Sequence, residues 1–250
     1  MAEALLRVEN VSKRFGGLLA VNDASLAAQA GRITALIGPN GAGKTTLFSI
    51  IAGFERPTAG RIIYEGDDIT GELPHRLARR AIARTFQIVQ PFTGLTVREN
   101  IAVGAHLSLR ARGAALAAAG DIADMVGLGD RLDRPAGALT VAGRKRLELG
   151  RALAIRPRLL LLDEVLAGLN PSEIRDMVPV IRAICDCGVT IVMIEHVMQA
   201  VMSLAEHVLI MSEGRIIAEG APQAVARDPR VVEAYLGRGA ASRMAGAGHG

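Results

Sequence analysis

The sequence has no tryptophan, and aromatic residues make up only 3% of its 250 positions although half of them are hydrophobic. The core must therefore be built mainly from Ala, Leu, Ile and Val, which favours helices packed on a buried parallel sheet. A chain of this length forms one large α/β domain, or one domain that carries a smaller inserted lobe. Two independent domains are not expected.

Cysteines are also scarce. The two that are present, Cys185 and Cys187, are too close to suggest a disulfide framework, and they lack the CxxC pairs or neighbouring His of a zinc site. We expect reduced thiols in a cytosolic protein. No basic and then apolar leader opens the chain, and no apolar run approaches the roughly 20 residues that span a bilayer, so any membrane role is expected to be peripheral.

Lysine is also scarce, because only Lys13, Lys44 and Lys145 of the 29 basic residues are lysines and the others are arginines. The formal net charge is +4, but basic and acidic residues are interleaved, and no basic tail or run of Lys and Arg is present. Such a distribution does not resemble a nucleic-acid footprint, so no nucleic-acid partner is expected. The surroundings of each lysine are informative in a chain that otherwise uses arginine.

Short apolar strands and helical segments alternate along the chain. Between residues 97 and 125 the pattern is helical and rich in Ala and Leu, with a break near Gly113, which indicates an inserted helical lobe. The Gly- and Ala-rich end, residues 238–250, is expected to be disordered. The expected strands are residues 5–8, 24–28, 32–37, 61–64, 159–162, 189–194, 208–211 and 215–219, and the other expected helices are 44–52, 144–155, 172–185 and one that starts at Pro74.

The sharpest motif is GPNGAGKT, Gly38 to Thr45, which fits GxxxxGK[ST] and lies between an apolar strand and a helix. Its small residues allow successive backbone N–H groups to face a β-phosphate. Lys44 places a compact charge between the β- and γ-phosphates, where a planar guanidinium does not fit, and the Thr45 hydroxyl ligates Mg²⁺. The expected ATP-binding residues are Gly38, Pro39, Asn40, Gly41, Ala42, Gly43, Lys44, Thr45 and Thr46.

A second motif is LLLLDE, residues 159–164, an apolar strand that ends in two adjacent acids. Because alternate strand residues point to opposite sides, Asp163 and Glu164 can take different roles. Asp163 would hold Mg²⁺, through water if need be, and Glu164 would polarise the attacking water as general base. An acidic pair after a strand is by itself more often a helix-start signal, but the phosphate-binding motif upstream favours the catalytic interpretation.

From residue 5 to about residue 236 the sequence resembles the ABC ATPases, and most of all the subunits that energise uptake of branched-chain and other hydrophobic amino acids. The segments that carry the resemblance are KRFGGLLAV (13–21), RTFQ (84–87), LTVAGRKRLELGRAL (139–153), LLLLDEVLAGLNP (159–171), IEHVM (194–198) and DPRVVEAYLG (228–237). The resemblance implies an α/β fold of the P-loop NTPase type, an ABC ATPase cassette with a mainly parallel core sheet, an antiparallel β subdomain and an inserted helical subdomain. Residues 1–88 and 137–237 would form the ATP-binding core with the β subdomain, and residues 89–136 the helical subdomain.

The resemblance also implies roles for single residues. Phe15 would stack on the adenine, Gln87 would contact Mg²⁺ and the attacking water, and His196 would touch the γ-phosphate. Taken alone, the three fit a core phenylalanine, a solvated amide and a surface histidine, but their order and spacing after the phosphate-binding motif favour the functional roles. The catalytic set is then Glu164, His196 and Gln87, and the metal ligands are Thr45, Gln87 and Asp163.

The chain departs from the family at its signature segment, commonly LSGGQ, which here reads LTVAG over residues 139–143. Thr140 keeps the hydroxyl that would bind the γ-phosphate across a dimer, whereas Val141 and Ala142 replace two glycines and Gly143 replaces the amide. Thr140, Ala142 and Gly143 would contact the nucleotide of the second subunit, and the substitutions bear on affinity and hydrolysis rate there. Asn170 stands where an Asp is frequent, which weakens the case for a charged contact between subunits.

The resemblance implies an ATP-hydrolysing subunit of an importer, peripheral on the cytoplasmic face of the inner membrane. Its partners would be a second ATPase subunit, transmembrane permease subunits and, indirectly, a periplasmic substrate-binding protein. A urea or amide substrate stays open. A soluble ABC ATPase acting on nucleic acid or the ribosome would need two cassettes or a long coiled coil, and a P-loop GTPase would need an NKxD motif that is absent. The apolar residues of segment 88–95 surround Pro91 and Gly94, so we expect some of them to be exposed as a permease contact.

Overall fold

Strands and helices alternate along the chain, and the computed structural model describes residues 4–86, 90–228, 230 and 231. The strands are β1 (Ala4–Phe15), β2 (Leu18–Gln29), β3 (Ile33–Ile37), β4 (Ala59–Tyr64), β5 (Asp67–Asp68), β6 (Ile82–Arg84), β7 (Leu159–Asp163), β8 (Thr190–Ile194), β9 (His207–Ser212) and β10 (Arg215–Gly220). The α-helices are α1 (Lys44–Ile51), α2 (Pro74–Arg79), α3 (Val97–Ala105), α4 (Arg112–Met125), α5 (Val141–Leu153), α6 (Pro171–Asp186), α7 (Met198–Leu204) and α8 (Pro222–Val225).

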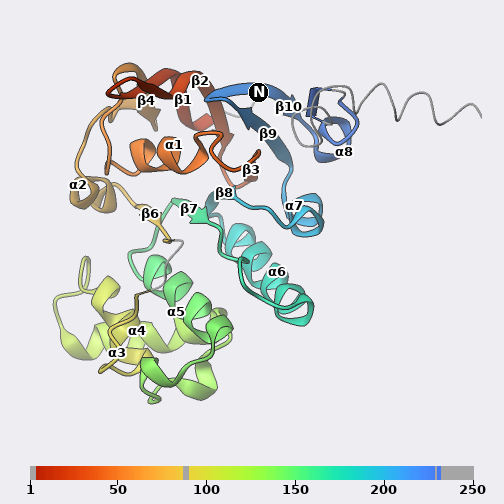
Figure 1. The fold of residues 1–250 in the computed structure, drawn as a ribbon. Coiled ribbons are helices and arrows are strands. Elements are labelled where there is room, and N and C mark those ends of the chain that lie inside the picture. The colour runs from red at the N-terminus through yellow and green to blue at the C-terminus, as the bar shows by residue number, and fades with distance from the viewer. Residues whose placement is uncertain (1–3, 87–89, 229, 232–250) are drawn as a thin grey trace, which may run out of the picture.

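The strands form two sheets, which lie one above the other in Figure 1. The larger has the order β10-β9-β3-β8-β7-β6, and all its pairs are parallel except β9 with β10. The smaller is antiparallel, in the order β2-β1-β4-β5. Because β3, β8 and β7 are parallel neighbours, their carboxyl ends meet at one edge, the place where open α/β sheets bind ligands. The predicted fold class, a mainly parallel sheet with an antiparallel β subdomain, is confirmed.

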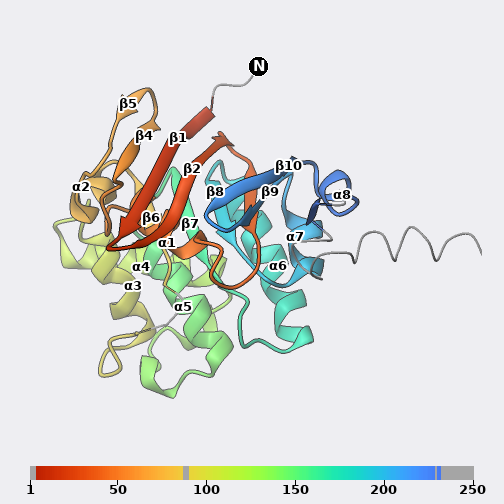
Figure 2. The same ribbon diagram turned by 45° about the horizontal axis from the view of Figure 1, so that its top comes forward.

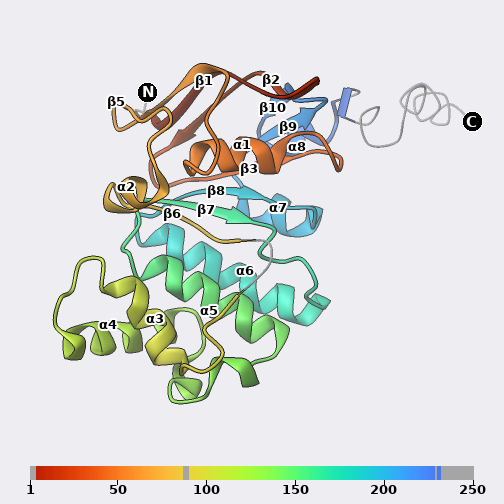
Figure 3. The same ribbon diagram turned by 60° about the vertical axis from the view of Figure 1, so that its left-hand side comes forward.

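Helix α1 is buried between the two sheets, as Figure 3 shows from the side. Leu47, Phe48 and Ile51 of this helix are fully buried in a cluster with residues of both sheets. Strand β7 uses both of its faces, because Leu161 joins this cluster and Leu162 joins the cluster on the opposite side. A strand buried on both faces reads as a continuous apolar run, which explains the LLLL sequence.

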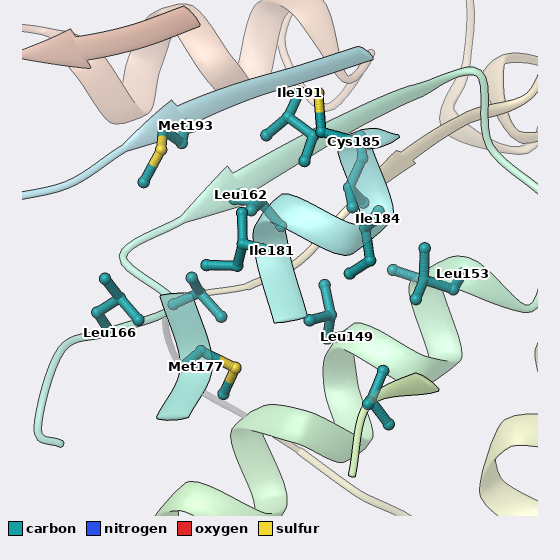
Figure 4. Close-up of a cluster of buried hydrophobic side chains, with 14 of the residues drawn as sticks. Leu149, Leu153, Leu162, Leu166, Met177, Ile181, Ile184, Cys185, Ile191 and Met193 are labelled. Carbon is teal, nitrogen blue, oxygen red and sulfur yellow. The ribbon is translucent and has the colours of Figure 1, made fainter. Parts of the chain in front are cut away.

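The opposite face of the larger sheet is covered by α5, α6 and α7. Figure 4 shows Met177, Ile181 and Ile184 of α6 in one cluster with Leu162 of β7, Ile191 and Met193 of β8 and Leu149 of α5. These apolar positions of α6 recur at intervals of three and four, the period of one helical face. Asn170 and Glu173 form a capping box that starts this helix.

Helices α3 and α4 pack on each other and on α5; they lie below β1 and β2 in Figure 2, and Figures 1 and 3 show them at the opposite end of the molecule from the antiparallel sheet. Ala115, Ala119 and Ala123 of α4 are fully buried, and their spacing of four places them on one helical face. A capping box between Thr96 and Glu99 starts α3. The predicted boundaries of the helical subdomain, residues 89–136, stay a prediction, and the predicted disordered tail, residues 238–250, lies outside the described residues.

Several local predictions differ from the structure. The helical break lies between Ala105 and Arg112 rather than near Gly113, because α4 tolerates a glycine in its first turn. Helix α5 begins at Val141 instead of Arg144, because the side chain of Thr140 accepts the N–H of Gly143 and caps it. Strand β6 and helix α7 were not predicted, since three strand residues and seven helix residues are too short for a periodic signal.

Within the described ranges, every helix is too short or too polar to cross a lipid bilayer.

Candidate active site

The phosphate loop, residues 38–45, connects the end of β3 to the first turn of α1. Two of its glycines have a backbone that other residues resist, with φ of 156° at Gly38 and 102° at Gly43. A Cβ atom at Gly38 would lie 2.0 Å from the carbonyl oxygen of Met211, and one at Gly43 would lie 2.3 Å from that of Ala20. The backbones of β9 and β2 therefore press against the loop, and only glycine fits at both positions.

Lys44 is the first residue of α1 and is only 5% exposed. Its ammonium group donates hydrogen bonds to the carbonyl oxygens of Gly38 (2.7 Å) and Pro39 (2.9 Å), so the side chain folds back over the loop. Burial lowers the pKa of Lys44, and the charges of Glu164 and Asp163 oppose that shift. A buried cation beside a helix N-terminus, close to two carboxylates, can bind a phosphate that carries a metal ion.

Asp163 is the last residue of β7 and is 1% exposed. Its Oδ2 atom accepts a hydrogen bond of 2.7 Å from Nη2 of Arg84, and its backbone N–H donates to the Thr85 hydroxyl at 3.1 Å. The other carboxylate oxygen, Oδ1, is buried and has no hydrogen-bond partner in the part of the chain that is described. Buried polar atoms are normally bonded, so this oxygen is available to a ligand.

The residues around Asp163 fit a magnesium ion. Thr45 and Asp163 line the same cleft of about 760 Å³ between the larger sheet and helices α3 and α5. A hydroxyl oxygen and a free carboxylate oxygen are the hard ligands that Mg²⁺ prefers, and the ion usually keeps several waters besides. The third predicted ligand, Gln87, lies outside the described residues.

Glu164 follows β7 with φ of 51°, a left-handed conformation that is rare outside glycine. Its backbone is held on both sides, because its N–H donates to Ile194 and its carbonyl oxygen accepts from Nζ of Lys145 at 3.1 Å. Its Oε1 atom lies 2.9 Å from Nε2 of His196, which follows β8. The two predicted catalytic side chains are therefore in direct contact, and the unusual backbone turns Glu164 toward that partner.

Glu195 precedes His196 and is 1% exposed. Its Oε1 atom accepts the backbone N–H of Leu166 at 2.9 Å, which joins the loop after β7 to the loop after β8. Burial raises the pKa of Glu195 to about 7, although hydrogen bonds from the backbone of Leu166 and His196 lower it, and the charge of Glu164 raises it further. The site thus contains a buried carboxyl group that the sequence did not suggest.

Phe15 ends β1 at the turn to β2 and is 44% exposed. The ammonium group of Lys13 lies 4.7 Å from the centroid of its ring, a cation–π contact. The same hairpin brings Ala20 against Gly43 of the phosphate loop. An exposed aromatic ring on a hairpin that touches the loop is accessible to a nucleotide base, in keeping with its predicted role.

The signature segment lies at the start of α5, where Thr140 and Val141 are exposed and Gly143 is buried. The Thr140 hydroxyl accepts the N–H of Gly143 at 3.2 Å, so it already serves as the helix cap. Its hydrogen is still able to donate to an anion. Ala142, the third predicted residue of this segment, is half-buried.

Sequence reasoning missed Arg84, Lys145 and Glu195. Lys145 is 5% exposed and reaches Glu164, and its signal was the rarity of lysine in this chain. Arg84 had a weaker signal, because it opens the RTFQ segment that carries part of the family resemblance. Nothing in the local sequence distinguishes Glu195 from an exposed acid, because its burial depends on the packing of two loops.

Two known protein families match the sequence of this chain. Residues 21–167 match the family described as ABC transporter, and residues 215–241 match the family described as branched-chain amino acid ATP-binding cassette transporter. The chain is 38% identical over 253 aligned residues to the high-affinity branched-chain amino acid transport ATP-binding protein BraF of Pseudomonas aeruginosa, with 95% of this chain and 99% of the relative covered. It is 37% identical to LivG of Escherichia coli, another high-affinity branched-chain amino acid transport ATP-binding protein, with the same coverage.

Solved structures agree with the sequence relatives. The ADP conformation of MJ1267, an ATP-binding cassette of an ABC transporter, superimposes with a TM-score of 0.86 and 34% identity, over 95% of this chain and all of that one. A nucleotide-free ATP-binding cassette from an ABC transporter gives the same TM-score and identity over 94% of this chain. The family match and the relatives agree with the site, in which the phosphate loop lies near Asp163 and Glu164. The chain belongs to the ABC transporter family of ATPases.

Proposed function

We propose that the chain binds Mg·ATP and hydrolyses it at the edge where β3, β7 and β8 end. The observation that carries this proposal is the meeting of three groups there: the buried Lys44, the half-free carboxylate of Asp163 and the contact between Glu164 and His196. The backbone of residues 38–45 binds the β-phosphate, Lys44 binds the β- and γ-phosphates, and Phe15 stacks on the adenine.

Each side chain has a separate task in hydrolysis. Glu164 accepts a proton from the attacking water, and the hydrogen bond from His196 orients its carboxylate. His196 would contact the γ-phosphate, and Gln87, which lies outside the described residues, is proposed to contact the attacking water. When bound, Mg²⁺ would neutralise developing charge on the phosphate oxygens, with Thr45, Asp163 and Gln87 as its proposed ligands. The carboxylate of Glu164 is 16% exposed at its side chain, so water reaches it.

The active unit is proposed to contain two ATPase subunits. Thr140 and Val141 are exposed at the start of α5, and Val141, at 57%, presents an apolar surface that a second subunit would cover. Thr140, Ala142 and Gly143 then contact the nucleotide held by the phosphate loop of the other subunit.

The transported substrate is proposed from the relatives. BraF and LivG are named for branched-chain amino acid transport, and the match at residues 215–241 names the same solutes. We therefore propose that the chain energises uptake of branched-chain or other hydrophobic amino acids through separate permease subunits, with a periplasmic binding protein that delivers the solute. It would lie on the cytoplasmic face of the inner membrane. The alternatives are uptake of urea or another amide, and a soluble role outside transport.

Radiolabelled uptake tests this proposal. Deletion of the gene in its host should abolish high-affinity uptake of leucine, isoleucine and valine, and leave urea uptake unchanged. A plasmid copy of the wild type should restore uptake, and a Lys44→Ala copy should not. Loss of urea uptake alone would favour the amide alternative. If the chain sediments with ribosomes instead of membranes, the transport role is wrong.

The permease contact is proposed at the segment before α3, around Phe92. The ring of Phe92 is 46% exposed, and the guanidinium of Arg151 lies 4.7 Å from its centroid. Its backbone is fixed, because its N–H donates to the buried Asn100 and its carbonyl oxygen accepts from the same side chain. The backbone of Phe92 is therefore held by Asn100 while its ring is exposed at the surface. Of the other apolar members of segment 88–95, Leu95 is half-buried, and Ile88 and Val89 lie outside the described residues.

Phe92→Asp distinguishes a ring that binds the permease from a ring that packs within the subunit. If the ring binds the permease, the variant should fold and bind ATP but fail to co-purify with the permease, and uptake should be abolished. Leu107→Asp is the matched control, because Leu107 is 44% exposed in the same helical region and does not line the cleft. An unfolded Phe92→Asp subunit would show a packing role, and normal assembly with normal uptake would refute both roles.

A further inference from the structure

Arg84 connects the wall of the cleft to the carboxylate of Asp163. It is the last residue of β6, whose register pairs it with Leu161 of β7, so its side chain reaches the residue at the end of that neighbouring strand. The guanidinium donates to Oδ2 of Asp163 at 2.7 Å and to the hydroxyl of Ser49 at 3.1 Å. The side chains of Arg84 and Asp163 are 8% and 1% exposed, so this ion pair is nearly dry.

The ion pair leaves the two oxygens of Asp163 with different tasks. Oδ2 is occupied by Arg84, whereas Oδ1 is buried without a partner among the described residues. The guanidinium has little freedom, because it lies 5.7 Å from the ring of Phe54 and 5.6 Å from the ring of Phe86. The two rings contact each other and lie on one side of the guanidinium, and a planar group that is packed in this way and bonded at two corners restricts the rotation of the carboxylate.

We propose that Arg84 is a positioning residue for the metal ion: it holds Asp163 by one oxygen so that the other stays directed at Mg²⁺. The proposal rests on the proposed function, in which Asp163 ligates the magnesium of Mg·ATP. Ligating carboxylates are oriented by hydrogen bonds from residues behind them, and loss of such a partner typically lowers metal affinity about 10- to 100-fold. The positive charge of Arg84 by itself disfavours a nearby cation. Arg84 therefore favours metal binding only through the planar shape of its guanidinium, which orients the carboxylate of Asp163.

The rival explanation is a buried ion pair that only stabilises the fold. It predicts a loss of stability without a specific change in metal affinity. Arg84→Lys separates the two, because it keeps the charge but loses the planar fork that bonds Ser49 and Asp163 together. Ser49→Ala is a milder second variant that removes one anchor of the guanidinium and leaves Arg84 in place. Arg80→Lys is the matched control, since Arg80 pairs with Glu72 and Asp67 and does not line the cleft.

Equilibrium binding gives the readout without turnover. A fluorescent, non-hydrolysable ATP analogue is titrated in EDTA, and Mn²⁺ is then titrated into the nucleotide complex and followed by electron paramagnetic resonance. Arg84→Lys should bind the metal-free nucleotide within twofold of wild type and bind Mn²⁺ at least tenfold more weakly. Ser49→Ala should shift Mn²⁺ affinity in the same direction by less, and Arg80→Lys should match wild type.

Wild-type Mn²⁺ affinity in folded Arg84→Lys would overturn the proposal. If Arg84→Lys does not fold by circular dichroism, Ser49→Ala decides, and wild-type affinity in that variant overturns it equally. Failure of the wild type to bind the ATP analogue at all would instead refute the proposed function.

Discussion

Glu195 should make the protein less stable as pH rises through neutrality. Its carboxyl group is 1% exposed and its pKa is raised, first of all by burial, from 4.5 to about 7. Between these two values an unfolded chain has released the proton while the folded chain keeps it. The folded state therefore binds more protons, and the free energy of unfolding falls as pH rises through this window. The group's contribution is fully present below pH 4.5 and is lost as pH passes about 7.

The magnitude follows from the size of the shift. Each unit of pKa difference corresponds to about 1.4 kcal/mol, so the raised pKa of Glu195 makes wild type lose about 3 kcal/mol between pH 4.5 and neutrality. Glu195→Gln does not ionise, and its amide oxygen can still accept the N–H of Leu166. The variant should therefore escape this loss. Its free energy of unfolding, taken relative to that of wild type, should be higher at pH 8 than at pH 5.

Urea unfolding at pH 5, 6, 7 and 8 measures the effect. Other groups titrate in both proteins, so the difference between wild type and variant isolates Glu195. Glu213→Gln is the control, because it removes one negative charge from an exposed turn. A difference between wild type and Glu195→Gln that stays constant from pH 5 to pH 8 would refute the reasoning, since Glu195 would then be ionised throughout.

Two further substitutions test the nucleotide site. Lys44→Arg keeps the charge, but the planar guanidinium is bulkier than the buried ammonium that donates to the carbonyl oxygens of Gly38 and Pro39. ATP affinity should therefore fall or vanish in a fluorescence titration. Unchanged affinity would contradict the phosphate-loop model. Thr140→Val should lose ATP-driven dimerisation in size-exclusion chromatography while each monomer still binds nucleotide, and it should lose about 1 kcal/mol of stability because the α5 cap is removed. Thr140→Ser, which keeps the hydroxyl, should dimerise, and equal dimerisation by both variants would show that the hydroxyl has no part in it.

The sequence predicted the parts of the site that are local. Gly38 to Thr45 is a contiguous motif between a strand and a helix, and the structure places it there. The LLLLDE run predicted an apolar strand that ends in two acids, and the structure has β7 there, completely buried. The roles of Glu164 and His196 were predicted but their contact was not, and it arises because β7 and β8 are neighbouring parallel strands whose carboxyl ends share an edge. Such features depend on pattern and on the general geometry of parallel sheets.

The features that the sequence could not predict depend on strand order and on packing. Arg84 and Asp163 are 79 positions apart and meet only because β6 is the neighbour of β7. Strand β6 has three residues, too few for an alternating pattern. The signature change at Thr140 was interpreted through the family alone, whereas the structure adds its capping of α5. Asn170, interpreted as a departure from the family's Asp, forms the capping box of α6.

The central claim is that Glu164 is the base of an ATPase, and Glu164→Gln tests it most directly. The substitution keeps the shape and can keep a hydrogen bond with His196, but an amide cannot accept a proton from water. Steady-state ATP hydrolysis by the purified subunit should fall at least about 100-fold, while ATP affinity is retained and the bound ATP favours a dimer. Hydrolysis near the wild-type rate in this variant would contradict the account.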